Sequence, residues 1–138
     1  MELALQERLI AAWSERPADI RSAPASDAQI RAFEQMLGAI PDDFRWFLQA
    51  CGGGVVGSEW VDDISALAET QKKFAAESSI SDGWRMKDVF VIGWDKAGNP
   101  FGIERPSGRV VVEDHDFGGV HEMAPSFGAF LASGLLES

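Results

Sequence analysis

The stretch VFVIGWDKAGNPFGIERPSGRVVVEDHDFGGVHEM, residues 89–123, decides the fold of this chain. It contains four short runs rich in β-branched and aromatic residues, with glycine, proline and aspartate between them: 89–94, 101–104, 109–113 and 120–123. Runs of this composition predict strands, and short polar segments between them predict turns that make neighbouring strands antiparallel. The sequence therefore predicts a series of consecutive hairpins in this half of the chain.

The residues on either side of this stretch show the spacing of amphipathic helices. Apolar residues recur three and four positions apart in five segments: about 2–13, 26–37, 41–50, 62–77 and 125–136. A short strand at 59–61 is predicted between the third and fourth helices. In the last helix, one face is predicted to be buried and consists of Phe127, Phe130, Leu131 and Leu135.

Local signals predict where the second and third helices begin and end. Ser26 and Gln29 form a capping box at the start of the second helix, and Gly38 is expected to end it in the left-handed helical conformation. Pro41 suits the first position of the third helix. The buried stripe of the second helix is predicted to be Ile30, Phe33, Met36 and Leu37.

Length and composition fit one globular unit. The chain has 138 residues, of which 46% are hydrophobic and 25% are charged, and this suits a single core. We predict one α+β domain over residues 1–138: N-terminal helices, a mostly antiparallel sheet of about four to six strands, and a closing C-terminal helix. No apolar run approaches the roughly 20 residues that span a bilayer, and a signal-peptide pattern is absent. We therefore expect a soluble cytoplasmic protein.

The net charge is strongly negative. The formal charge of −10 argues against direct binding to nucleic acid or to an anionic membrane, since phosphates would be repelled. It is compatible with a basic protein partner. An acidic surface that only keeps the protein soluble would give the same charge.

Residues 110–123 hold four carboxylates and both histidines of the chain, yet they predict no catalytic or metal site. His115 and His121 are six residues apart in a hairpin, where alternate residues face opposite sides, so they form a poor ligand pair. The acids of this segment look too solvated for acid/base work. The only cysteine, Cys51, lies at a predicted helix end and is interpreted as buried and structural. We expect no enzyme activity and no cofactor.

Tryptophan stands out, because the chain has five tryptophans and no tyrosine. Three of them, Trp60, Trp84 and Trp94, lie on or beside predicted loops that also carry acids. Aromatic anchors among acids are what a hot spot for a basic partner requires, although each could equally fill the edge of the core. The predicted partner-binding residues are Trp60, Asp62, Asp63, Trp84, Asp95, Asp114 and Asp116.

Three segments resemble the SUKH superfamily, which includes the Smi/Knr cell-wall regulators and many bacterial immunity proteins. They are IRAFEQMLGAIPDDFRWFLQACGGG (30–54), VFVIGWDKAGNPFGIERPSGRVVVEDHD (89–116) and MAPSFGAFLASGL (123–135). They are similar to the family's helix–break–helix with a glycine turn, its hairpin stretch and its closing helix. Together they span about 28–136. One departure is Cys51, where the family more often has an asparagine.

The resemblance implies an α+β fold and a protein that binds other proteins without catalysis. Bacterial members typically bind and neutralise a toxin domain, often a nuclease, so a basic toxin is the partner that the resemblance implies. An alternative within the family is a regulatory scaffold without a toxin partner. A remote alternative is a metal-dependent enzyme that uses His115 and His121.

Overall fold

The computed structural model describes residues 1–137, and within them the chain forms five α-helices and six strands. The helices are α1 (Leu3–Ser14), α2 (Asp27–Leu37), α3 (Asp42–Ala50), α4 (Ile64–Ser78) and α5 (Phe127–Leu135), with a 3-10 turn at Ala18–Ile20. The strands are β1 (Gly54–Val56), β2 (Glu59–Val61), β3 (Val89–Trp94), β4 (Pro100–Glu104), β5 (Val110–Glu113) and β6 (Val120–Ala124).

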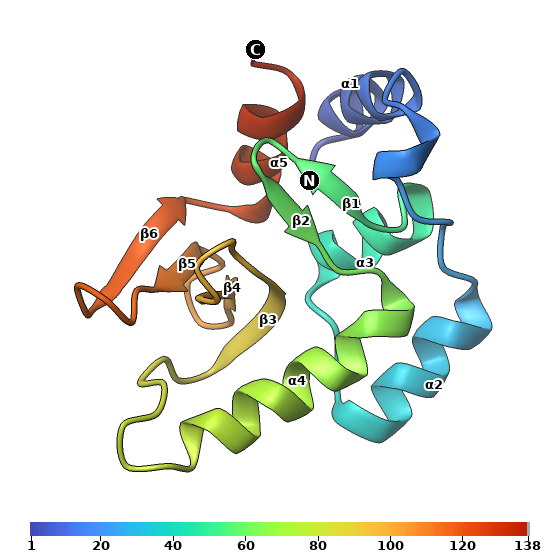
Figure 1. Ribbon diagram of the computed structural model, residues 1–138. Helices are drawn as coiled ribbons and strands as arrows, with labels where there is room; N and C mark the ends of the chain where they lie inside the picture. Colours follow the sequence, from blue (N-terminus) through green and yellow to red (C-terminus); the bar gives the residue numbers. More distant parts are fainter. Residues whose placement is uncertain (138) are drawn as a thin grey trace.

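The predicted α+β class is confirmed. Strands β3, β4, β5 and β6 form one antiparallel sheet in chain order, as the hairpin pattern predicts, and β1 and β2 form a separate antiparallel hairpin. Figure 1 shows α4 alongside β3, α2 beyond α4, and β6 on the outer side of the sheet. The closing helix α5 follows β6 directly and packs against α1 and α3.

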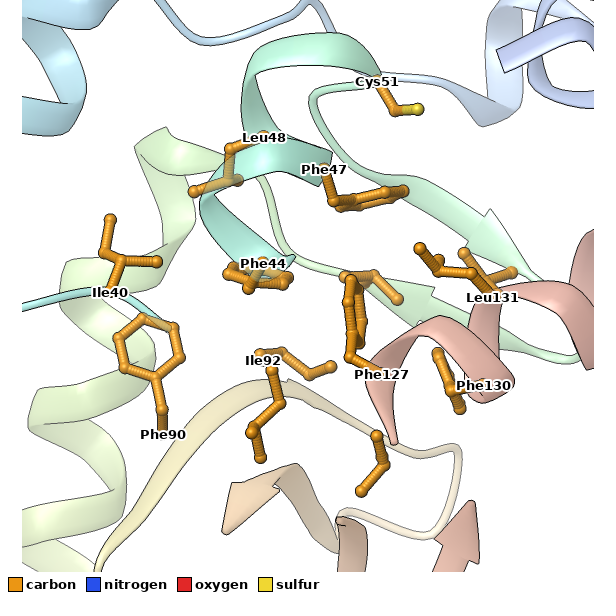
Figure 2. Packing of buried hydrophobic residues seen from close by; sticks show 14 of the residues in the cluster. Ile40, Phe44, Phe47, Leu48, Cys51, Phe90, Ile92, Phe127, Phe130 and Leu131 are labelled. Atoms are coloured by element: carbon orange, nitrogen blue, oxygen red, sulfur yellow. The ribbon is translucent and has the colours of Figure 1, made fainter. Parts of the chain in front are cut away.

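Aromatic side chains from α3 and α5 fill the centre of the core. Phe44 and Phe47 are fully buried on the inner face of α3, and Phe127 of α5 meets them edge-on, with ring centroids 5.3 and 5.6 Å away. Figure 2 shows these rings packed above strand β3, which contributes Phe90 and Ile92. Edge-to-face pairs of this kind add to the free energy of burial. The predicted buried face of α5 is confirmed.

The two edges of the four-stranded sheet differ. At β3, the side-chain amide of Gln71 donates to the Val91 carbonyl at 2.6 Å and accepts from the Val91 N–H at 3.3 Å. The backbone N–H of Asp62 donates to the Ile92 carbonyl at 2.8 Å. At the other edge, the first three residues of β6 are exposed, and no strand of the described chain pairs with its outer side.

The glycine run after α3 is partly a strand, where the sequence predicts only flexible backbone. Gly54 begins β1 and forms a bridge with Arg21. Its φ is +138°, and a Cβ at this position would lie 2.2 Å from the Ile20 carbonyl oxygen. The glycines therefore permit the close approach of two backbone segments that are more than thirty residues apart in the chain.

Three details of α2 and α3 differ from the prediction. Met36 and Leu37 are 72% and 36% exposed, because the buried face of α2 is limited to Ile30 and Phe33 and its last turn lies beyond the core. Gly38 has φ 97° and ψ 177°, which is not the left-handed helical conformation. Pro41 is the residue before α3 rather than its first residue. The capping box of Ser26 and Gln29 is confirmed.

Candidate partner-binding site

A cluster of aromatic rings from three segments forms the most distinctive surface of the molecule. Trp84 lies in the connection between α4 and β3, Trp94 ends β3, and His115 follows β5. The Trp84 ring centroid lies 6.2 Å from that of Trp94 and 6.1 Å from that of His115. Beside them is a pocket of about 360 Å³, which we call the Trp84 pocket. It is lined by Glu77, Ile80, Asp82, Gly83, Trp84, Gly98 and His115.

Buried Glu113 holds the connection that carries Trp84. Its side chain is 7% exposed and accepts hydrogen bonds from the backbone N–H groups of Arg85, at 2.7 Å, and Met86, at 2.8 Å. A carboxylate that accepts from two adjacent backbone donors fixes the conformation of that segment. The indole N–H of Trp84 donates to Glu77 Oε1 at 2.9 Å. Trp84 is therefore held from strand β5 and from the last turns of α4.

Buried Asn99 joins two turns next to His115. Asp95 accepts from the backbone N–H of Asn99 at 2.8 Å and from its side-chain NH₂ at 3.1 Å. This orients the side-chain amide oxygen of Asn99, Oδ1, toward His115, whose backbone N–H donates to it at 3.0 Å. The His115 Nδ1 atom contacts the same oxygen and therefore carries the hydrogen. The β3–β4 turn and the β5–β6 turn are thus linked to each other.

The seven predicted partner-binding residues fall into two groups. Trp84 lines the pocket, and Asp95, Asp114 and Asp116 lie in the turns whose backbone and side chains meet around Asn99 and His115. Trp60, Asp62 and Asp63 lie on β2 and at the start of α4, outside the lining of the pocket. Trp60 is 44% exposed.

Two acids of the second group have partners within the fold. The Thr70 hydroxyl donates to Asp62 Oδ2. Burial raises the pKa of Asp62, against the opposing effect of the Thr70 hydrogen bond. Asp63 is the N-cap of α4 and accepts from the backbone N–H groups of Ser65 and Ala66 at 3.0 and 3.1 Å.

The acids of the β5–β6 turn also differ from each other. Asp114 Oδ1 accepts from the backbone N–H groups of Phe117 and Asp116, and these hydrogen bonds lower the pKa of Asp114. Asp116 is well exposed, and its Oδ1 atom lies 3.2 Å from His115 Nε2. Phe117, at the tip of this turn, is 91% exposed and is not among the seven predicted contact residues.

Glu77, Ile80 and Asp82 also line the pocket and were missed. The sequence places them at the end of α4 and just after it, where charged residues normally face solvent. One signal was available, because an indole N–H near the core needs an acceptor and Glu77 is a helical carboxylate shortly before Trp84.

The histidines are engaged separately. His115 contacts Asn99, whereas His121 Nε2 lies 3.2 Å from the Gly118 carbonyl oxygen. In the part of the chain that the structure describes, no three side chains of His, Cys, Asp or Glu are grouped so that they could hold a metal ion. Cys51 is buried, as predicted, and burial raises the pKa of its thiol to about 12. No helix within residues 1–137 is long and apolar enough to cross a membrane.

Fold and site together define a small α+β domain whose distinctive surface is aromatic and acidic. The chain belongs to the SMI1 / KNR4 family (SUKH-1), whose family model matches residues 24–133. This confirms the resemblance seen in the three sequence segments. No curated protein sequence matches the chain.

Proposed function

We propose that this protein is a non-catalytic immunity protein that binds and neutralises a cognate toxin domain in the cytoplasm. The observation that carries the proposal is the Trp84 pocket, where an aromatic anchor lies among carboxylates on a domain of the SUKH-1 family. Buried aromatic anchors contribute much of the binding energy at protein interfaces. The fixed connection around Trp84 reduces the entropy lost on binding.

The charge of the chain supports a basic partner. Nuclease toxins carry lysine and arginine to bind phosphates, and a surface of net charge −10 attracts such a domain over long range. Four predicted contact residues, Trp84, Asp95, Asp114 and Asp116, are concentrated around the pocket and its two turns. We therefore propose the surface around the Trp84 pocket as the main contact with the partner, and the surface around Trp60 as the second candidate.

The test first asks whether a gene next to that of this chain encodes a toxin domain, and then uses that domain as the candidate partner. The two purified proteins are mixed and their association is measured from about 50 mM to about 500 mM salt. We expect a tight complex whose association rate falls steeply as salt rises. An association rate that is insensitive to salt would rule out attraction between the acidic surface and a basic partner. The absence of a complex, together with a biosynthetic gene neighbourhood, would favour a regulatory scaffold.

Alanine variants then locate the interface. Trp84→Ala should weaken the complex by more than about 2 kcal/mol, roughly 30-fold, if Trp84 is an anchor. Trp60→Ala tests the second group in the same way. Met36→Ala is the matched control, since Met36 is a large exposed apolar residue on α2. Unchanged affinity in both tryptophan variants would show that neither tryptophan is an anchor of the interface.

A further inference from the structure

We infer that the Trp84 pocket binds one cationic side chain, an arginine or a lysine, which the partner protein inserts. The inference rests on the proposed function only in taking a protein as the partner. It adds the chemistry of the group that enters the pocket. Four features support this ligand: the shape of the pocket, its charge, a cation already bound to the same aromatic cluster, and the rigidity of the pocket.

The pocket has the size and lining for an extended side chain. Its volume of about 360 Å³ lies at the small end of the range of ligand sites. Trp84 supplies an aromatic wall, and Ile80, which is 61% exposed, supplies an aliphatic one. The aliphatic stem of an arginine or lysine can pack against such walls while its charged end reaches polar groups.

The charges of the lining select a cation. Glu77 and Asp82 both line the pocket, and its described lining contains no lysine or arginine. Glu77 Oε1 accepts the Trp84 indole N–H, which leaves Oε2 available to a ligand. Asp82 makes no hydrogen bond or ion pair within residues 1–137. An anionic ligand would be repelled by both groups, whereas a guanidinium or ammonium group can contact a carboxylate and the indole face together.

The chain already places a cation on the adjacent ring. Lys73 Nζ lies 4.1 Å from the ring centroid of Trp94, and this ring contacts Trp84. The aromatic cluster thus binds a cation within the fold, because Lys73 covers the ring of Trp94. The ring of Trp84, in contrast, borders the open pocket.

The walls are fixed before a ligand arrives. Glu113 anchors the backbone beside Trp84, and the contacts of His115 with Asn99 anchor the part of the lining that His115 supplies. A site held by several hydrogen bonds loses little conformational entropy on binding. A single side chain can therefore bind measurably even without the rest of the partner.

The experiment titrates the whole protein with N-acetylarginine amide, and in parallel with N-acetylcitrulline amide, which has nearly the same shape and no charge. The indole N–H signals are followed by NMR at low salt, and the Trp84 signal is identified by its loss in Trp84→Leu. We expect a saturable shift of the Trp84 signal with arginine, with a dissociation constant of roughly millimolar size, and little shift with citrulline.

Two pocket variants and one control sharpen the result. Asp82→Asn and Glu77→Gln should each weaken arginine binding at least about fivefold. Met36→Ala, on α2 and outside the pocket, should leave it unchanged, and circular dichroism checks that each variant is folded. Equal shifts with arginine and citrulline, or full affinity in folded Asp82→Asn, would overturn the inference.

The outcomes separate this inference from the proposed function. A toxin complex of full affinity in folded Trp84→Leu and Asp82→Asn would overturn the pocket's role and leave the immunity function standing. Selective arginine binding at Trp84 supports the inference, whatever the gene neighbourhood shows.

Discussion

At the scale of single residues, the acids of this chain divide by whether a donor of the fold lies within reach. Asp63, Asp95 and Asp114 each accept from nearby backbone N–H groups, and Asp62 accepts from Thr70. Asp116 is the well-exposed residue among the five acids that are predicted contacts. A sequence shows that a carboxylate is present, but whether a donor faces it depends on turns that form only in the fold. The sequence could therefore suggest which residue types belong to the candidate site, but it could not show which of the acids have a hydrogen-bond donor within the fold.

Asp62 gives a prediction that separates a structural role from a contact role. Because burial raises its pKa, the unfolded chain releases the proton first, and stability falls as pH rises through the window between the unfolded and folded pKa values. Asp62→Asn removes this cost and keeps an acceptor for Thr70. We expect Asp62→Asn at neutral pH to be as stable as the natural chain or more stable, by up to about 1 kcal/mol in urea unfolding.

The pH dependence of the difference checks its cause. As pH falls well below 3.8, the ordinary value for this group, Asp62 becomes protonated in both states, and the advantage of Asp62→Asn should vanish. A variant that loses more than about 1 kcal/mol at neutral pH would show that the ionised carboxylate stabilises the fold.

At the scale of elements, the sequence was sufficient where the signal is local. The capping box at Ser26, the hairpins of residues 89–123 and the buried face of α5 depend on neighbours a few positions away, and all three are confirmed. Strand β1 was missed although its partner β2 is close in the chain, because the glycines around Gly54 predicted flexible backbone. The anchoring of the Trp84 connection was missed because the two groups are far apart in the chain: Glu113 lies 28 positions after Arg85.

Glu113 gives the prediction at this scale. Glu113→Ala leaves the backbone donors of Arg85 and Met86 without their acceptor in a partly buried place. An unsatisfied buried donor costs about 1–3 kcal/mol, so we expect a loss of that size in the free energy of unfolding. The amides of Arg85 and Met86 should exchange faster with solvent, and arginine binding at the Trp84 pocket should weaken.

The neighbouring acid Glu122 provides the matched control. Its side chain is 43% exposed and lies 3.5 Å from Arg109, an exposed pair that contributes little. Glu122→Ala should therefore change stability by less than about 0.5 kcal/mol. If the amide exchange rates and the free energy of unfolding were the same in Glu113→Ala as in Glu122→Ala, Glu113 would not anchor the connection.

At the scale of the whole molecule, fold class and family were predictable because they rest on many weak signals in a fixed order along the chain. The three segments that carry the resemblance lie within or overlap residues 24–133, which the family model matches. The surface was less predictable, since which exposed side chains become neighbours depends on how the loops meet. Trp84, Trp94 and His115 are distant in sequence and form one cluster only after the sheet closes against α4.

The net charge of the molecule gives the last prediction. A charge of −10 on 138 residues repels itself, and the folded state concentrates that repulsion. Raising sodium chloride from about 10 mM to about 300 mM should raise the melting temperature, and a gain of about 1 kcal/mol corresponds to roughly 4 °C. Near pH 4.5, the calculated isoelectric point, the same salt should have little effect. A melting temperature that falls with salt at neutral pH would mean that attractive charge pairs dominate.

The side-chain amide of Gln71, which reaches from α4 to the edge of strand β3, has a consequence for polymerisation. Growth of a fibre by strand pairing needs two open edges in every copy, one for the previous molecule and one for the next. Gln71 and the Asp62 N–H already occupy backbone groups of Val91 and Ile92, so the middle of β3 is closed to pairing with another chain. Strand pairing through the remaining edge of this sheet, β6, can join two copies, and no open edge is then left for a third. Such pairing would end at a dimer and would not grow into a fibre.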